Sequence, residues 1–201
     1  LSSGDEYADT VALLMRGTGS DSHTTDHSSA AFCAGLDFSL AKEVVHTPEQ
    51  GFLMCQMMSE ALTRLRSLDM ISVALLHGPA LGGGAELSTA CDFRLMTDTP
   101  TSKIGFVHAK LGASPGWGGG RRLVQIVGRR RALRLLGSAH VLSPAEALDA
   151  ELVDAVLPLS SSSSSSSTSA VSSPGSSCVQ HGLEFLLPFT SMPYPRAVKD
   201  L

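Results

Sequence analysis

Hydrophobic and polar residues alternate along the chain in blocks that predict strands and helices in turn. Short apolar runs closed by polar or glycine-rich turns are typical of buried strands. Four such runs cover residues 11–15, 71–77, 93–96 and 153–157. Segments with helical periodicity lie between several of them, and strands that alternate with helices predict an α/β layered fold.

The segment 47–68 has the strongest helical pattern in the chain. Thr47 is suited to cap the helix, Pro48 fits its first position, and Gln50 completes a capping box. Apolar side chains then recur at helical spacing as far as Leu68. Further helices are predicted at residues 85–91, 121–127, 130–136 and 143–150, the last one opened by a second capping box.

Composition divides the chain into three parts. Residues 1–158 carry the alternating pattern and form the predicted core domain. Residues 159–177 include eight consecutive serines, which have too little apolar surface to offset the entropy of ordering, so this part is predicted to be a disordered insert. Apolar residues return in 178–201 together with three prolines, which predicts a partial helical tail.

The overall composition excludes two classes of partner. Hydrophobic residues make up 43% of the chain and charged residues 17%, which is ordinary for a globular protein. The net charge of −4 offers no basic surface for nucleic acid. No apolar run approaches the roughly 18 residues needed to span a bilayer. We therefore expect no nucleic-acid partner and no membrane association.

Cysteine usage and the N-terminus bear on the cellular compartment. The four cysteines are widely spaced and form no CxxC pair, which argues against a zinc site and a disulfide framework and favours buried thiols in a reducing compartment. The first residues do not form a signal peptide, and an initiator Met is absent. We expect a cytosolic protein whose sequence is a fragment, with a lost targeting segment left open.

Two histidines, His23 and His27, lie in the polar segment 21–30. Their spacing suits a metal ligand pair, but no carboxylate or cysteine cluster supports it. A solvated loop is the favoured interpretation, and no metal is expected.

Three consecutive glycines, Gly82, Gly83 and Gly84, join the strand at 71–77 to the helix that follows. Glycines allow a backbone to approach a ligand closely, and the first N–H groups of a helix are free to bind an anion. The pattern matches neither GxGxxG nor a P-loop. It indicates an oxyanion site, although consecutive glycines also occur in plain loops.

Other segments make this pattern specific. They read Phe32-Cys-Ala-Gly-Leu-Asp37, His77-Gly-Pro-Ala-Leu-Gly-Gly-Gly-Ala-Glu-Leu87, Cys91-Asp-Phe-Arg94 and Leu111-Gly-Ala-Ser-Pro-Gly-Trp-Gly-Gly-Gly-Arg-Arg-Leu123. In this order they resemble the crotonase (enoyl-CoA hydratase/isomerase) superfamily over about residues 11–157. The resemblance implies a spiral of ββα units whose N-terminal strands are missing here and whose C-terminal helical region is incomplete. It also implies a homotrimer or hexamer for the full-length form.

The resemblance places the family's chemistry on four residues. The oxyanion hole of the family consists of two backbone N–H groups, which map to Leu36 and Gly83. Hydratases of the family use two glutamates. The first maps to Glu86, whereas the second falls on His108, so that paired acid/base addition of water is in doubt.

Substrate contacts follow by the same analogy. The implied ligand is an acyl-CoA, whose coenzyme A is part of the substrate, so no separate cofactor is expected. Ala34 would lie near the adenine, Gly82 and Gly84 would let the backbone approach the substrate closely, and Trp117 would either wall the acyl pocket or pack in the core. A basic cluster is interpreted as a solvated helix face in preference to a CoA contact; its members are Arg121, Arg122, Arg129, Arg130 and Arg131.

Residues 102–108 and 114–117 are more similar to the superfamily's decarboxylases that act on ethylmalonyl-CoA than to its hydratases. The implied reaction is ethylmalonyl-CoA to butyryl-CoA, or methylmalonyl-CoA to propionyl-CoA, as metabolite repair in the cytosol. A glutamate at 108 would face the substrate carboxylate, and two such charges 4 Å apart repel by about 4 kcal/mol at a surface-like dielectric. His108 removes this repulsion and is expected to orient the carboxylate, while Glu86 or His108 supplies the proton.

Alternatives remain open. His108 could be a satisfied core histidine, and Glu86 could be an acid stabilised by the helix dipole. At the level of function, the first alternative is another crotonase reaction, such as enoyl-CoA hydration or isomerisation with Glu86 alone. The second is a truncated, non-catalytic subunit with the same fold.

Overall fold

A computed structural model describes residues 10–17, 31–158 and 174–192 of the chain. The other segments, including His23, His27 and the serine run at 160–167, lie outside the described residues. In the described ranges, no helix is both long and apolar enough to cross a membrane.

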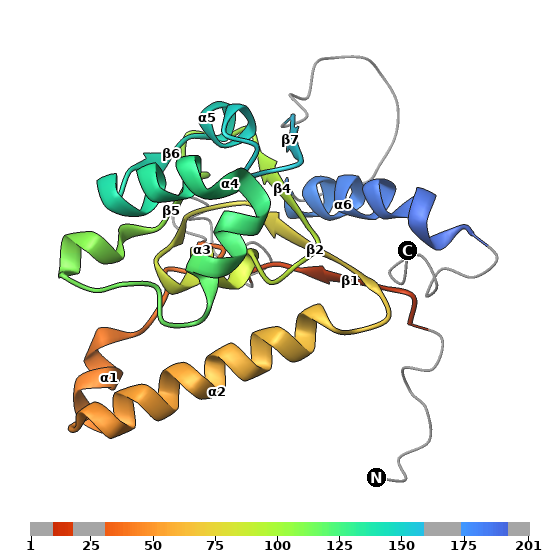
Figure 1. The fold of residues 1–201 in the computed structure, drawn as a ribbon. Coiled ribbons are helices and arrows are strands. Elements are labelled where there is room, and N and C mark those ends of the chain that lie inside the picture. Colours follow the sequence, from red (N-terminus) through yellow and green to blue (C-terminus); the bar gives the residue numbers. More distant parts are fainter. Residues whose placement is uncertain (1–9, 18–30, 159–173, 193–201) are drawn as a thin grey trace, which may run out of the picture.

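Four parallel strands form the central sheet (Figure 1). In spatial order they are β1 (Ala12–Met15), β2 (Ile71–Leu76), β4 (Phe93–Thr97) and β7 (Ala155–Leu157). Each of them coincides with an apolar run that predicts a strand, because strands covered on both faces need apolar residues at nearly every position.

Strand β2 shows how the sheet is covered on both faces. All six of its residues are buried. Val73 and Leu75 pack towards helix α6 (Pro174–Thr190), whereas Ala74 and Leu76 belong to the larger core on the opposite face. Successive side chains of a strand point to opposite faces, so this single strand anchors two hydrophobic clusters.

A second, smaller sheet carries the loops that contain residues of the candidate site. It contains β3 (Ala80–Leu81), β5 (Ile104–Gly105) and β6 (Val141–Leu142), with β3 parallel to β5 and β5 antiparallel to β6. Cys33 extends this sheet through an isolated bridge to Ala80. The bridge brings the segment around residue 34 to the end of β3.

The described residues contain seven helical segments. They are α1 (Phe38–Val44), α2 (Pro48–Arg66), α3 (Gly83–Ser88), the 3-10 helix η1 (Val107–Leu111), α4 (Gly119–Ser138), α5 (Pro144–Asp149) and α6. Both predicted capping boxes are present, with Thr47 and Gln50 at α2 and with Ser143 and Glu146 at α5. The two helices predicted at 121–136 form α4, which is interrupted where Gly128 has a φ of 77°.

Several helices differ from the sequence predictions. Helix α3 begins at Gly83 rather than at residue 85, because the Glu86 N–H already donates to the Gly82 carbonyl. Helix α1 was not predicted, although Asp37 caps it by accepting from the N–H groups of Ser39 and Leu40. Helix α6 starts at Pro174, inside the part predicted to be disordered, since proline needs no N–H partner at a helix start.

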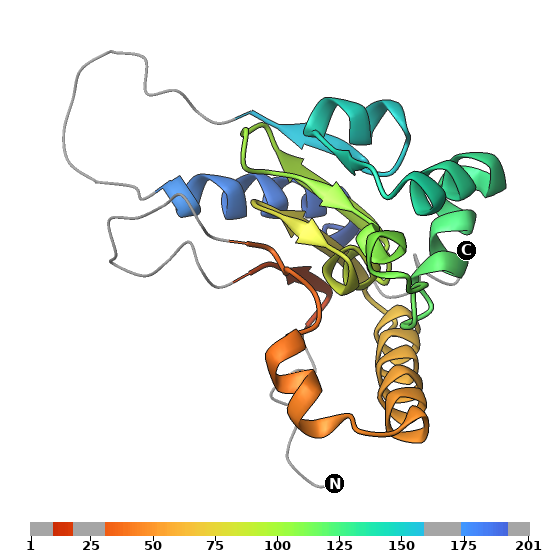
Figure 2. The ribbon, with the colours of Figure 1, turned by 90° about the vertical axis from the view of Figure 1, so that its left-hand side faces the viewer.

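Helix α6 covers one face of the central sheet, on the side away from α4 and α5 (Figures 1 and 2). Phe93 of β4 contacts Phe185 and Phe189 of α6, with ring centroids 5.3 and 5.2 Å apart. Leu186 is buried beside them. Helix α6 and the face of the sheet that it covers therefore form a second hydrophobic core.

Helix α2 stands apart from the body of the molecule (Figure 1). Leu62 is its only fully buried residue, whereas Phe52 is 68% exposed and Met57 61%. Leu68, expected on the inner face, is also exposed. The predicted helix is present, but much of its apolar surface is unpaired within the described residues.

Candidate active site

The glycine turn between β3 and α3 has a backbone that only glycine adopts readily. Gly82 has a φ of +55° and a ψ of −118°, and its N–H donates to the Gly105 carbonyl at 2.9 Å. The Gly83 N–H follows at the first position of α3 and has no acceptor among the described residues. It is therefore available to a ligand.

The segment that contains Leu36 packs directly against this turn. A Cβ on Gly84 would overlap the Cys33 carbonyl oxygen, so glycine is needed for the contact. Gly35 has a φ of +98°, and a Cβ placed on it would lie 3.0 Å from the Gly83 nitrogen. The Leu36 N–H, one residue further on, also lacks an acceptor in the described part of the chain. The two predicted oxyanion donors thus lie on adjoining backbone segments.

Glu86 is buried on α3, and both oxygens of its carboxylate have polar partners. The side chain is 2% exposed. Its Oε2 accepts the backbone N–H of Trp117 at 2.8 Å and that of Gly119 at 2.9 Å. A Cβ on Gly119 would meet the Glu86 side chain, which explains why glycine stands there. Hydrogen bonds to a charged group are each worth about 1.5–3 kcal/mol, which offsets the cost of burying the carboxylate.

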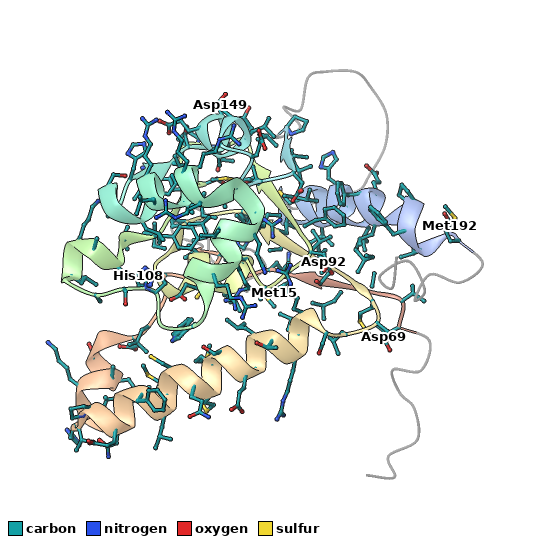
Figure 3. All side chains as sticks on the ribbon, in the orientation of Figure 1. Met15, Asp69, Asp92, His108, Asp149 and Met192 are labelled. Atoms are coloured by element: carbon teal, nitrogen blue, oxygen red, sulfur yellow. The ribbon has the colours of Figure 1, made fainter. Side chains whose placement is uncertain are left out.

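His108 projects from η1 towards α3 (Figure 3). Its Nε2 lies 3.1 Å from Glu86 Oε1, and the side chain is 14% exposed. A Cβ built on Gly82 would lie 4.0 Å from the same Nε2, so this edge of the ring borders the glycine turn. Nδ1 is buried and has no hydrogen-bond partner among the described residues. The predicted pair of functional side chains is therefore brought into direct contact.

Trp117 serves the site through both its backbone and its ring. The half-buried indole lies over Gly83, where a Cβ would overlap it. Gly82, Gly83, Glu86, His108 and Trp117 thus converge at one place, whereas Ala34 is exposed on the nearby loop.

Arg122 is a residue whose position the sequence prediction missed. It was grouped with a solvated basic cluster, and its four companions are exposed, but Arg122 itself is buried. Its guanidinium donates to the carbonyl oxygens of Trp117 at 2.8 Å and Glu86 at 3.2 Å, and to Thr89 Oγ1 at 3.0 Å. Burial lowers the pKa of Arg122, while the Glu86 charge partly raises it.

The backbone donors at Trp117 and Gly119 were also missed. Their role depends on the loop before α4 closing onto α3, a contact between residues more than 30 positions apart. The consecutive glycines from Gly118 were the available hint, since glycine there permits close backbone approach.

A polar surface cavity of about 580 Å³ lies elsewhere, between the second half of α4 and α5. Two of its lining side chains form ion pairs, with Arg131 2.9 Å from Glu151 and His140 3.3 Å from Glu146. None of the predicted site residues lines it. The Glu86–His108 region, where the predicted residues come together, is therefore the better candidate.

Comparison with known proteins identifies the family. Residues 25–169 match the sequence model of the enoyl-CoA hydratase/isomerase family. The chain is 52% identical over 126 residues to ethylmalonyl-CoA decarboxylase of Xenopus laevis, covering 63% of this chain and 41% of that protein. It is 42% identical over 170 residues to the Bos taurus protein of the same name, covering 85% and 50%. The chain thus spans about half the length of these relatives.

Among solved structures, enoyl-CoA hydratase from Bacillus anthracis superimposes with a TM-score of 0.74 at 26% identity, over 97% of this chain and 65% of that one. The predicted α/β, crotonase-like fold is therefore confirmed. By its matched profile, its relatives and its fold, the chain belongs to the enoyl-CoA hydratase/isomerase (crotonase) family.

Proposed function

We propose that the protein is a CoA-thioester decarboxylase that converts ethylmalonyl-CoA to butyryl-CoA, and methylmalonyl-CoA to propionyl-CoA. The relatives named ethylmalonyl-CoA decarboxylase support this substrate class. Coenzyme A is part of the substrate in this proposal, so the reaction itself calls for no further cofactor.

The reaction proceeds in two steps. The bond between the α-carbon and the substrate carboxylate breaks, carbon dioxide leaves, and the bonding electrons move into the thioester to give an enolate. The α-carbon then takes up a proton, proposed to come from Glu86 or His108, and the thioester is restored. In the first step the negative charge moves onto the thioester oxygen, so stabilisation of that oxygen lowers the barrier.

The N–H groups of Leu36 and Gly83 are proposed to bind the thioester oxygen. Both lack an acceptor among the described residues and lie on adjoining segments. A preorganised donor of this kind is typically worth about 2.7–4 kcal/mol in the transition state. Gly82 and Gly84 allow the backbone to come this close, and Trp117 covers the turn.

The hydrogen bonds that the Glu86 carboxylate already makes are the observation that favours decarboxylation over hydration. Addition of water needs a pair of acid/base groups that exchange protons with it. Here Glu86 already faces two backbone N–H groups and His108, and the second glutamate of hydratases is absent. Loss of carbon dioxide needs no base, and His108 presents a polar group without the charge that would repel a malonyl-type carboxylate.

The wider setting is also part of the proposal. We place the protein in the cytosol, in repair of side products of acyl-CoA metabolism, and expect a homotrimer or hexamer of the full-length form. Ala34 would lie near the adenine of coenzyme A. These statements rest on the family resemblance.

Release of carbon dioxide from ethylmalonyl-CoA tests the proposal directly. Wild-type protein should release it and should not hydrate or isomerise an enoyl-CoA. His108→Ala should lower the rate about 100-fold or more if His108 orients the carboxylate, whereas His140→Ala, a histidine outside the site, should not. Hydration without decarboxylation would favour the hydratase alternative, and inactivity on both substrates would favour a non-catalytic subunit.

A further inference from the structure

We propose that Glu86 is a positioning residue that fixes the tautomer of His108, with the hydrogen on Nε2, and thereby makes the site accept a substrate carboxylate. This inference rests on the proposed function and deepens it, because it assigns the two side chains different roles.

The hydrogen bonds of Glu86 favour its carboxylate form. Oε2 accepts from the N–H groups of Trp117 and Gly119, at 2.8 and 2.9 Å. Oε1 lies 3.1 Å from His108 Nε2. A hydrogen on Oε2 would face one of the two backbone donors, and these N–H groups stabilise a negative charge on the side chain, so the arrangement favours the carboxylate anion over the neutral acid.

The tautomer of His108 then follows from the surroundings of its two ring nitrogens. A nitrogen that faces a carboxylate oxygen at hydrogen-bond distance must carry a hydrogen, which places one on Nε2. Nδ1 is buried without a partner among the described residues. A buried donor without an acceptor is costly, so the neutral ring with a bare Nδ1 is the least strained arrangement.

The same Nε2 borders the glycine turn that holds the predicted oxyanion donors. It lies 4.0 Å from the Cβ position of Gly82. A hydrogen at this edge can be shared with an incoming carboxylate, whereas a lone pair there would repel it, and the two N–H groups on Glu86 Oε2 offset part of the repulsion between that carboxylate and Glu86. This tautomer therefore favours the binding of substrates that carry a carboxylate over those that do not.

Glu86→Gln offers a nearly isosteric way to reverse the tautomer. The amide oxygen would turn to the two backbone N–H groups, because only an acceptor fits there. The amide NH₂ would then face His108 Nε2, which must become an acceptor, and the hydrogen would move to Nδ1. The corresponding Asp→Asn exchange in the Ser-His-Asp triad of serine proteases leaves the geometry intact and costs about 10⁴ in rate.

Steady-state kinetics tests the functional half of the inference. In Glu86→Gln, the KM for ethylmalonyl-CoA should rise about tenfold or more, in proportion to a lost hydrogen bond to a charged group. The inhibition constant of butyryl-CoA, which lacks the carboxylate, should stay within about twofold. Equal weakening of both ligands would indicate general damage to the site and overturn the inference, and so would no change in either.

Glu146→Gln is the matched control, since Glu146 Oε1 also faces a histidine, His140, at 3.3 Å but on the exposed surface. It should change neither constant.

Nitrogen-15 NMR of histidine-labelled wild-type protein tests the structural half and needs no turnover. Wild-type His108 should show a protonated Nε2 and a bare Nδ1, and Glu86→Gln should show the reverse. A wild-type His108 with its hydrogen on Nδ1 would overturn the inference even if Glu86→Gln does not fold. If the tautomer is as stated but no carbon dioxide is released, the proposed function fails and the positioning role stands.

Discussion

At the scale of single residues, the glycines around the site are fixed by what they touch. Gly84 is in contact with the Cys33 carbonyl, and Gly119 with the Glu86 side chain. In both places an added methyl group would overlap atoms that cannot easily be displaced. The glycine-rich segments therefore hold the site together rather than loosen it.

Gly84→Ala should destabilise the fold by about 1–3 kcal/mol, because the added methyl group overlaps backbone. Gly137→Ala is the matched control, since that glycine lies in α4 with nothing within 4 Å of its Cβ position. It should be neutral or stabilise by up to about 1 kcal/mol. Denaturant unfolding of both variants checks the difference, and equal effects would contradict the close packing of the Cys33 segment.

His77 is expected to make stability depend on pH. Burial lowers its pKa from the model-compound value of 6.5, the Arg16 charge lowers it further, and the Leu75 carbonyl partly opposes this. The folded state therefore favours the neutral ring, and its stability should fall as the pH drops through 6.5 and below.

The difference in unfolding free energy between wild type and His77→Gln isolates this effect. The unfolding free energy of the wild type, relative to that of His77→Gln, should decrease between pH 7.5 and 5.5. This range extends about one unit either side of an ordinary histidine pKa. A difference that is constant over this range would show that His77 does not titrate differently on folding.

At the scale of elements, local chemistry predicted most of the helices and strands. The caps of α2 and α5 and the apolar runs of the central sheet were all readable, because each depends on residues close together in sequence. The start of α3 was placed two residues late, since consecutive glycines weaken helix propensity while the Gly82 carbonyl nonetheless accepts the first helical bond. Tertiary contact overrode propensity there.

Ser143→Ala should lower the unfolding free energy by about 1 kcal/mol, as loss of a helix N-cap does. The backbone N–H and hydroxyl of Ser143, together with His140, lower the pKa of Glu146 to about 2. Without the hydroxyl this pKa should rise towards its ordinary value, which NMR titration can follow. An unchanged Glu146 pKa would contradict the capping geometry.

At the scale of the whole molecule, site residues could be predicted only where a sequence motif identified them. Glu86 and His108 were placed by resemblance, and the structure brings them to 3.1 Å. The donors at Trp117 and Gly119 and the buried Arg122 were not foreseen, because they depend on how the loop before α4 closes onto α3. No local pattern encodes a contact of that range.

The proposed assembly is a further prediction at this scale. Light scattering on the full-length form should give three or six times the mass of one chain, since the family resemblance implies a trimer or hexamer. The same measurement on the present chain shows whether its residues suffice for assembly. A single-chain mass for the full-length form would contradict the prediction.

The central claim is that the Leu36 and Gly83 N–H groups together bind one thioester oxygen. Isotope-edited infrared difference spectroscopy of bound butyryl-CoA, labelled with carbon-13 at its carbonyl, tests it most directly. Two hydrogen bonds should move the carbonyl stretch to lower frequency than in water, where its partners are less well aligned. A stretch at or above the frequency in water would show that the pair of amides does not hold the oxygen, and would contradict the account.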